Sequence, residues 1–381
     1  MGIIIVSQDY PPDIGGIQTY TIELARRFYQ YSNKLSVIAP QKKLDFKIDK
    51  LSPFVTHRIS TVNTLLPLTL LPVLPVIVEK EDAKIVFHTQ WQTVVSSILT
   101  QKWVNHKIVV AVHGRELLFT PFPPHSFMER MYLDQMKRII NHVDHFFPVS
   151  NYTRHKLIDL GISKEKITLF NNGTDPTYFR PVDVTDFRKK EIGANRRVIL
   201  SMARLVKWKG IDTVLYALPR IKKAIPDILY LIVGEGPDRE RLEKIVGDLG
   251  LENHVRFTGA FRNKKRVFYY NLCDVFVQTS KSEYPDVEGF GIVFLEANAC
   301  GKPVIGSRTG GIPDAIDEGE TGLLVEQSNP HDLAEAVVLL LRNPDYAEVL
   351  GKQGRDKVVR KANWDIIGAE MHSKLEEILT Q

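Results

Sequence analysis

The sequence predicts an α/β protein built from two doubly wound domains. Its 381 residues are long for a single hydrophobic core, so two domains are expected. Near-continuous apolar runs alternate with amphipathic segments of helix length, which is typical of parallel sheets covered by helices on both faces. A turn-rich stretch at 171–181 separates two such series. We therefore expect Rossmann-like domains at 1–175 and 176–363, whose strand ends face a central cleft.

The first domain opens on the short apolar run Gly2–Val6, which has the form of a strand and not of a signal peptide. Further strands are expected at Leu35–Ala39, Ala83–His88, Lys107–His113, His145–Val149 and Lys166–Phe170. Helices are expected at Ile17–Tyr31, Phe127–Asn141 and Thr153–Leu160. The apolar segment Leu65–Val78 is too short to span a bilayer comfortably, and three prolines interrupt it. No transmembrane anchor is expected here.

The second domain repeats the alternation of strand and helix. Its strands are expected at Val198–Met202, Leu229–Val233, Val255–Thr258, Val275–Gln278 and Pro303–Ile305. Its helices are expected at Ile211–Ala224, Asp238–Leu249, Ile292–Cys300 and Pro330–Leu341. A last amphipathic segment covers Trp364–Leu379.

The composition is that of an ordinary globular protein, with 44% hydrophobic and 25% charged residues. Two cysteines, Cys273 and Cys300, form neither a disulfide framework nor a zinc site, and we expect buried thiols in a reducing, cytoplasmic compartment. The net charge of +5 falls in residues 1–175, which hold 20 Lys and Arg against 15 Asp and Glu. This excess suits an anionic acceptor or membrane headgroups, and an ordinary solvated surface explains it equally well. No basic stripe interleaved with aromatics indicates nucleic-acid binding.

The first strand leads into a glycine-containing turn that suits anion binding. Gly15 and Gly16 directly precede a helical pattern, so free amides at the positive helix end can face a phosphate. A glycine pair also simply shapes turns. Asp9 and Gln18 flank this turn and are candidate acceptor-binding residues, although a strand end and a solvated helix explain them too. His113 ends another apolar run, where a neutral imidazole could bind a sugar hydroxyl or help position an acceptor. A structural histidine is the alternative, and the position of His113 relative to the other motifs favours the functional interpretation.

Two cations follow the strand expected at Val198–Met202. The Arg204 guanidinium can hold two phosphate oxygens in a planar fork, and the Lys209 ammonium supplies a mobile point charge. Together they could stabilise a departing diphosphate. Two solvated loop cations are the alternative. Gly234, directly after the strand expected at Leu229–Val233, and Arg256, in the strand expected at Val255–Thr258, are candidates to contact the nucleotide base. Gly234 also fits a plain strand-to-helix turn.

The most specific motif is the run Glu288-Gly-Phe-Gly-Ile-Val-Phe-Leu-Glu296. Its glycines disfavour a continuous helix, so Glu288 is expected on a loop and Glu296 in the first turns of the following helix. The two carboxylates could then accept hydrogen bonds from different parts of one ligand. The amides around Phe290, Gly291 and Ile292 would form a helix N-terminus suited to phosphate. Surface or helix-end charges are the alternative.

With these motifs the whole chain resembles the retaining glycosyltransferases of family 4, which have the GT-B fold. The resemblance rests on Asp9–Gln18, His113-Gly114, Arg204 with Lys209, Glu288 with Glu296, and Gly310–Pro313. The runs Asp9–Gln18 and Asp286–Glu296 are also similar to those of bacterial mannosyltransferases that act on phosphatidyl-inositol mannosides. This similarity suggests GDP-mannose as donor.

The resemblance implies a role for each matching position. Arg204 and Lys209 would bind the donor diphosphate, Glu288 the sugar hydroxyls and Glu296 the ribose. Gly16 and the Phe290–Ile292 amides would approach phosphates, and His113 would contact the donor sugar. It also implies that the C-terminal helix, at 364–381, crosses back to the first domain.

We therefore expect a retaining hexosyltransferase that needs no cofactor and no catalytic metal. The cations would neutralise the diphosphate, and no Asp-x-Asp metal pair is found in the sequence. The donor is expected to be GDP-mannose, with UDP-sugars as the alternative. The acceptor would be a hydroxyl of a glycolipid, a saccharide or another small molecule. The amphipathic segment Phe127–Asn141, with Arg130, Lys137 and Arg138, could contact anionic lipid at the inner face of the membrane, and an ordinary surface helix packed on the sheet is the favoured alternative. A nucleotide-sugar epimerase and a non-catalytic nucleotide-sugar sensor are the competing hypotheses.

Overall fold

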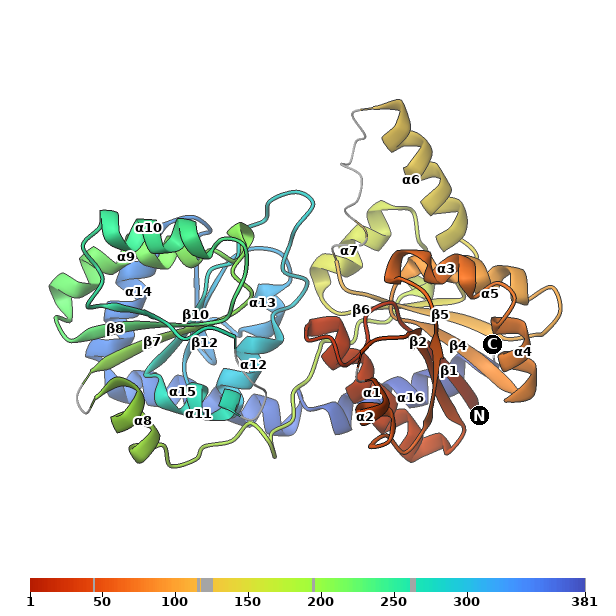
Figure 1. The fold of residues 1–381 in the computed structure, drawn as a ribbon, viewed down its shortest axis with the longest axis horizontal. Coiled ribbons are helices and arrows are strands. Elements are labelled where there is room, and N and C mark those ends of the chain that lie inside the picture. Colours follow the sequence, from red (N-terminus) through yellow and green to blue (C-terminus); the bar gives the residue numbers. More distant parts are fainter. Residues whose placement is uncertain (44, 115–116, 118–125, 194–195, 261–264, 381) are drawn as a thin grey trace. The chain divides into compact units, whose positions relative to one another are not determined.

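The computed structural model describes residues 1–43, 45–114, 117, 126–193, 196–260 and 265–380. The chain divides into two compact units. Unit 1 comprises Met1–Asn172 together with Trp364–Gln381, and unit 2 comprises Gly173–Asn363. Each unit contains a six-stranded sheet whose neighbouring strands are all parallel, with helices on both faces (Figure 1). The expected fold class, two doubly wound α/β domains, is confirmed.

The sheet of unit 1 has the strand order β3-β2-β1-β4-β5-β6. Its strands are β1 (Gly2–Val6), β2 (Leu35–Pro40), β3 (Val55–Ile59), β4 (Ala83–His88), β5 (Lys107–Val112) and β6 (His145–Pro148). Strands β1, β2 and β4 are buried almost throughout, as expected for a sheet covered on both sides.

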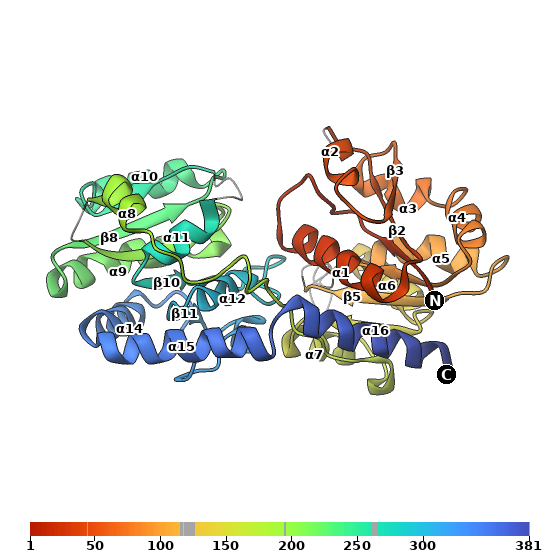
Figure 2. The ribbon, with the colours of Figure 1, turned by 90° about the horizontal axis from the view of Figure 1, so that it is seen from below.

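The helices of unit 1 range in length from 4 residues in α3 to 17 residues in α1 and α16. They are α1 (Gly16–Ser32), α2 (Asp45–Asp49), α3 (Leu66–Thr69), α4 (Leu74–Lys80), α5 (Val94–Thr100), α6 (Phe127–Ile140), α7 (Asn151–Asp159) and α16 (Trp364–Thr380). Figure 2 shows α16 beside α1 in this unit. A Cβ at Gly368 would lie 2.6 Å from the Cβ of Arg27, so glycine allows the two helices to approach closely. Arg27 also pairs with Asp365 at 3.0 Å.

The sheet of unit 2 has the order β12-β11-β10-β7-β8-β9. Its strands are β7 (Arg197–Met202), β8 (Ile228–Val233), β9 (Val255–Phe257), β10 (Val275–Gln278), β11 (Val304–Ser307) and β12 (Gly322–Val325). Its helices are α8 (Thr185–Ile192), α9 (Ile211–Ala224), α10 (Arg239–Asp248), α11 (Arg266–Leu272), α12 (Ile292–Ala299), α13 (Ile312–Ala315), α14 (Pro330–Arg342) and α15 (Pro344–Arg360). Helices α9, α10 and α14 pack their apolar faces into one core cluster with the sheet.

Several elements differ from the sequence expectations. The strand expected at Lys166–Phe170 is wrong, because the structure has a 3-10 turn at Lys164–Lys166 and only one isolated bridge, between Ile167 and Phe146. Strand β3 was not expected, since His57 and Arg58 interrupt its apolar pattern. Strand β12 and helix α15 were missed as well.

The apolar segment in unit 1 forms two short helical stretches. Among the described residues, no single helix is long and apolar enough to cross a membrane. The stretches Asn63–Thr69 and Leu74–Lys80 pass that test only as a pair bent by 68°. Both cysteines are buried free thiols, as expected. Burial raises the pKa of the Cys273 thiol to about 12, which makes it unreactive near neutral pH.

Candidate active site

The order of the strands marks one ligand-binding edge in each unit. In a doubly wound sheet, ligands bind outside the carboxyl ends of the two strands between which the winding direction reverses. In unit 2 this reversal lies between β7 and β10, and in unit 1 between β1 and β4. The loops after β7 and β10 carry Arg204, Lys209 and Glu288. The loop after β1 carries Asp9, Gly15 and Gly16.

In unit 2, Lys209 and Glu288 form an ion pair although they are 79 residues apart in the sequence. The Lys209 Nζ lies 2.6 Å from Glu288 Oε2, and the two side chains are only 17% and 14% exposed. The same ammonium lies 4.0 Å from the centre of the Trp208 ring. Ser280 Oγ donates a second, longer hydrogen bond of 3.3 Å to Glu288 Oε2. The structure thus brings together the cation and the carboxylate that the sequence assigned to one site.

Arg204 lies on the same segment, directly after β7, and is exposed. Its neighbour Leu205 is buried. The Leu205 backbone holds the segment in place, because Leu205 N donates a hydrogen bond to Glu235 O at 2.9 Å. The guanidinium therefore projects from an anchored backbone at the carboxyl edge of the sheet.

Glycines allow the chain to close around Glu288. A Cβ at Gly310 would lie 2.4 Å from the Glu288 carbonyl oxygen, and Gly311 N donates to that oxygen at 2.8 Å. Gly291, which precedes α12, has φ +92°, and a Cβ there would lie 2.7 Å from the Phe294 ring. A glycine is therefore needed at 291, and the amides of the first turn of α12, from Ile292 on, have no acceptor within the helix.

Three residues at the end of β10 and in the loop after it fasten the segment that carries Lys209. Gln278 Nε2 donates to Lys209 O at 2.5 Å, and Thr279 Oγ1 donates to Gly210 O at 2.9 Å. The Lys281 amide donates to Trp208 O at 2.6 Å. Gly210 has φ +68°, and a Cβ there would lie 1.8 Å from Thr279 O, so no other residue fits.

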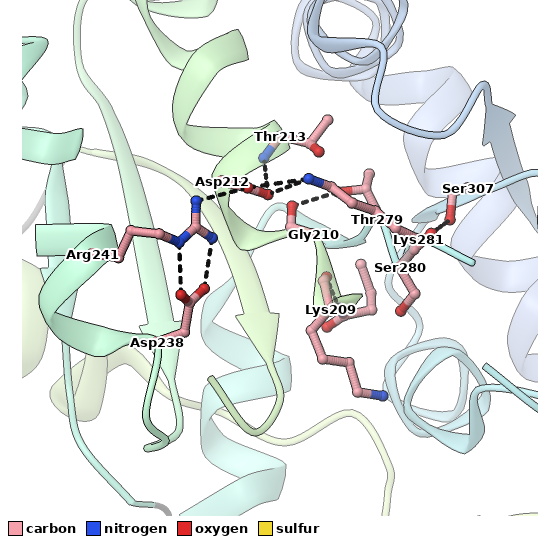
Figure 3. Close-up of polar contacts among 11 residues, drawn as sticks. Lys209, Gly210, Asp212, Thr213, Asp238, Arg241, Thr279, Ser280, Lys281 and Ser307 are labelled. Atoms are coloured by element: carbon pink, nitrogen blue, oxygen red, sulfur yellow. Dashed lines mark hydrogen bonds and ion pairs between the residues drawn. The ribbon is translucent and has the colours of Figure 1, made fainter. Parts of the chain in front are cut away.

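The side chain of Lys281 extends this contact into a chain of alternating charges (Figure 3). Its Nζ lies 2.9 Å from Asp212 Oδ1, and Arg241 lies 3.0 Å from Asp212 Oδ2. Arg241 makes two further bonds of 2.6 Å to Asp238, and this contact raises the pKa of the guanidinium. Asp212 and Asp238 are buried at the starts of α9 and α10, where their charge also suits the helix dipoles. The network ties both helices to the loop after β10.

Glu296 lies apart from this group, inside the unit. Its side chain is 3% exposed, forms an ion pair with Arg266, and accepts a hydrogen bond of 2.6 Å from the Tyr270 hydroxyl. Burial and the Glu296 charge both raise the pKa of Tyr270. Arg266 also stacks 5.2 Å from the centre of the Phe179 ring. The ribose role of Glu296 stays a prediction, and a ligand would have to share this carboxylate with two partners.

The two candidates for the base side occupy different places. Gly234 follows β8 with φ +151°, and a Cβ there would lie 1.8 Å from Ala203 O, so its glycine allows the loops after β7 and β8 to touch. Arg256 lies on β9, and its guanidinium donates to the Glu191 carbonyl at the end of α8. Arg256 also lies near Arg196, which precedes β7. The structure does not bring Arg256 to the loops that carry Arg204 and Lys209.

In unit 1 the glycine turn forms the start of α1 as expected. Helix α1 begins at Gly16, with Gly15 before it. A Cβ at Gly15 would lie 2.3 Å from Gln18 Oε1, so glycine leaves room for the Gln18 side chain to fold back. Gln18 Nε2 then donates to Asp9 Oδ1 at 3.5 Å. Asp9 and Gln18, which the sequence flagged separately, meet at this edge.

His113 follows β5, and its ring meets the Tyr20 ring edge-on at 4.7 Å. Burial lowers the pKa of His113 to about 3, so the imidazole is neutral at physiological pH. It can donate or accept a hydrogen bond, and it cannot supply a positive charge. Tyr20 in turn packs edge-on against Trp364, the first residue of α16.

Sequence reasoning missed several polar residues of these edges. In unit 2 they are Asp212, Gln278, Ser280 and Lys281, and in unit 1 they are Asn63 and Gln90. Most follow a buried strand directly, so the rule that ligands bind at carboxyl strand ends could have flagged them. Within the described ranges, no group of three or more His, Cys, Asp or Glu side chains is placed to hold a metal ion.

The fold and these two edges are those of a two-domain α/β protein with a ligand-binding edge in each unit, and comparison with known proteins specifies its family. The group described as Glycosyltransferase Family 4 matches residues 14–178, and glycosyl transferases group 1 matches residues 183–357. A GDP-mannose-dependent alpha-(1-6)-phosphatidylinositol monomannoside mannosyltransferase of Mycobacterium tuberculosis is 30% identical over 97% of this chain and 96% of its own. The chain belongs to this family of GT-B glycosyltransferases and is a hexosyltransferase.

Other relatives extend the comparison. N-acetyl-alpha-D-glucosaminyl L-malate synthase of Bacillus anthracis is 25% identical over 97% of this chain and 95% of its own. Among solved structures, Anabaena HepE in complex with UDP has a TM-score of 0.84 at 20% identity, and covers 99% of this chain and all of its own. Sucrose-phosphate synthase from Thermosynechococcus elongatus also has a TM-score of 0.84, at 23% identity with full coverage of both chains. These two structures support the fold.

Proposed function

We propose that this enzyme transfers mannose from GDP-mannose to a hydroxyl group of a glycolipid or saccharide acceptor, with retention of the anomeric configuration. The observation that carries the proposal is the Lys209–Glu288 pair at the strand reversal of unit 2, on loops of which the first also carries Arg204. A sugar joined to a diphosphate needs both kinds of group within one site. The relative that is 30% identical over 97% of the chain bears GDP-mannose in its name, which supports the choice of donor.

In the proposed mechanism the donor diphosphate lies along the loops after β7 and β10. Arg204 and Lys209 stabilise the negative charge that grows on the departing diphosphate, together with the amides of Phe290, Gly291 and Ile292. This assigns to cations and amides the charge neutralisation that a metal supplies in other transferases. Glu288 accepts hydrogen bonds from the sugar hydroxyls once Lys209 has turned to the phosphate.

On the other side of the reaction we place the acceptor at unit 1. Asp9 and Gln18 bind its hydroxyls, and neutral His113 donates a hydrogen bond to the donor sugar near the reacting carbon. The acceptor hydroxyl attacks the anomeric carbon on the face that the diphosphate leaves, and a phosphate oxygen takes its proton. We also assign a phosphate contact to Gly15 and Gly16, because a glycine backbone can approach an anion closely at a helix start.

A donor screen tests the proposal. Purified enzyme is incubated with GDP-mannose, UDP-glucose, UDP-N-acetylglucosamine or ADP-glucose and a panel of glycolipid and saccharide acceptors, and products are identified by mass. We expect a mass increase of one hexose with GDP-mannose. NMR of the product anomer tests retention, and an inverted anomer would exclude this mechanism. Conversion of the donor without any acceptor would favour an epimerase instead.

A UDP-sugar-dependent transferase is the second candidate. It is favoured by the N-acetylglucosaminyl transferase among the relatives and by the UDP complex of the fold neighbour HepE. In the same screen it predicts transfer from a UDP-sugar and none from GDP-mannose. Donor binding without transfer to any acceptor would support a nucleotide-sugar sensor.

We further propose that the enzyme works in the cytoplasm and contacts anionic lipid through α6. Phe127 and Met128 are about three-quarters exposed at the start of this helix. Arg130, Lys137 and Arg138 add positive charge along it. Sedimentation with anionic and with neutral vesicles tests this contact. Equal binding to both, or none to either, would contradict it.

A further inference from the structure

A buried glutamine ends strand β10 at the carboxyl edge of the unit 2 sheet. The other three residues of this strand, Val275, Phe276 and Val277, are apolar and fully buried, and Gln278 itself is only 1% exposed. An amide side chain in such a place loses its contacts with water. Strand β10 is one of the two strands between which the winding direction reverses. A polar residue that breaks the apolar pattern of a buried strand at this edge indicates a functional role.

The hydrogen bonds of Gln278 leave half of its amide group unsatisfied. Among the described residues, its side chain donates one hydrogen bond, from Nε2 to Lys209 O at 2.5 Å. Its Oε1 is buried and has no hydrogen-bond partner in the same part of the chain. The orientation of the amide follows from the first contact, because a carbonyl oxygen only accepts and therefore faces the amino group. A buried acceptor without a partner lowers the free energy of unfolding, so stability alone does not explain a glutamine here.

The one contact that Gln278 makes acts on the residue that carries the cation. Lys209 ends a short 3-10 turn, and the carbonyls of Trp208, Lys209 and Gly210 all accept hydrogen bonds from the end of β10 and the loop after it. Gln278 donates the bond that Lys209 itself accepts. Because each residue has only two soft backbone torsions, a fixed carbonyl restricts the direction in which the Lys209 side chain leaves the chain.

We infer that Gln278 is a positioning residue of the donor site, which holds the Lys209 backbone so that the ammonium reaches the diphosphate of a bound nucleotide. The inference rests on the proposed function, in which Lys209 stabilises the departing diphosphate. Gln278 is buried and its free atom is an acceptor, as phosphate oxygens are, so it acts through Lys209 and not on the phosphates directly. A displacement of about 1 Å in a catalytic group can reduce a rate about 100-fold, so one fixed carbonyl is sufficient for a measurable effect.

A double-mutant cycle with Lys209 tests whether Gln278 acts through that residue. Calorimetry measures the affinity for GDP and for UDP of the wild type, Gln278→Met, Lys209→Met and the double variant. Gln278→Met keeps the length of the side chain and removes its hydrogen bond. We expect about three- to tenfold weaker nucleotide binding, with a melting temperature close to that of the wild type. In the Lys209→Met background the same substitution should change the affinity less than about twofold, because no ammonium remains to be positioned.

Ser201→Ala is the matched control for the loss of a buried hydrogen bond beside this strand. Ser201 Oγ donates to Val277 O at 2.6 Å and accepts from the Tyr230 hydroxyl, and neither contact involves the Lys209 segment. Its substitution should lower the melting temperature and leave nucleotide affinity within about twofold of wild type. If Gln278→Met does not fold, Gln278→Asn takes its place in the cycle, because its amide is one methylene shorter and does not reach Lys209 O from the same backbone position.

Two outcomes of the cycle would overturn the inference: unchanged nucleotide affinity of Gln278→Met, or an effect in the Lys209→Met background as large as in the wild type. An equal loss of affinity in Ser201→Ala would also overturn it, since it would show a general effect of packing around β10. If the wild type binds nucleotide and transfers a hexose while the cycle is additive, only the role of Gln278 is wrong. If the wild type binds neither GDP nor UDP, the proposed function fails, and this inference fails with it.

Discussion

The Lys209–Glu288 pair predicts that one substitution will improve nucleotide binding while it abolishes transfer. Without ligand, the ammonium and carboxylate neutralise each other at 2.6 Å. A nucleoside diphosphate that draws Lys209 away leaves the Glu288 charge uncompensated and close to the phosphates. A donor that carries its sugar compensates this carboxylate with hydroxyl groups. Glu288→Gln removes the uncompensated negative charge that weakens binding of the free nucleotide. The substitution should therefore favour binding of GDP or UDP.

The structure gives the magnitude. Two unit charges at this distance attract each other by about 6 kcal/mol at an effective dielectric constant of about 20. Desolvation of the two largely buried groups offsets most of this attraction, and we take a net contribution of about 1–2 kcal/mol. Such a difference changes an equilibrium constant about 5- to 30-fold. Glu288→Gln should thus bind GDP or UDP about 5- to 30-fold more tightly than wild type.

Isothermal titration calorimetry with GDP and UDP measures this effect, and an initial-rate assay should show transfer reduced at least about 100-fold. Ser280→Ala is the matched control, because it removes the 3.3 Å contact to the same carboxylate oxygen and keeps the ion pair. Its nucleotide affinity should stay close to that of wild type. Unchanged or weaker nucleotide binding by Glu288→Gln would refute the reasoning.

Three further predictions concern other groups of the site. Arg204→Ala should reduce transfer about 100- to 1,000-fold with an unchanged melting temperature, because Arg204 is exposed, and near-normal turnover would exclude its role at the diphosphate. Lys281→Met should raise the donor KM and lower kcat, and Lys281→Arg should restore both, because Lys281 holds the Lys209 segment through its amide on Trp208 O and its ammonium on Asp212. Arg241→Met removes the other cation that pairs with Asp212 and should change only stability. Equal kinetic effects of Lys281→Met and Arg241→Met would contradict this prediction. His113 has a folded pKa of about 3, so its contribution to stability is complete above about pH 6.5 and is lost as the pH falls toward 3. Urea unfolding at pH 7 and pH 5 should show a smaller difference for His113→Gln than for wild type, and an equal difference would contradict the prediction.

The sequence predicted most of the regular structure because the buried strands are nearly pure apolar runs. Strands β1, β4 and β10 and helix α9 have the expected bounds. The failures share a cause. Strand β3 contains His57 and Arg58, which pair with Glu81 and with Asp49, so side-chain partners from elsewhere replace the apolar pattern. At 166–170 the apolar residues pack beside β6 without a ladder.

The candidate site was predictable in its residue types and not in its pairings. In the sequence, Glu288 and Glu296 flank one glycine-rich run, and the local pattern places the first on a loop and the second in a helix. In the fold, Glu288 pairs with Lys209 at the sheet edge and Glu296 lies against Arg266 and Tyr270 in the interior. Nothing local to the motif predicts these partners, because Lys209 and Arg266 come from other segments of the chain.

The amino-acid sequence by itself determined the alternation of strand and helix, and the glycines and charged residues that follow the strands. These are local properties, set by hydrophobic period and by backbone conformations that only glycine adopts easily. Only the tertiary structure decided that Lys281 fastens the Lys209 segment through Asp212 and that the side-chain amides of Gln18, Asn63 and Gln90 surround Asp9. The order of strands in a parallel sheet brings such residues together, and contacts between distant segments fix that order.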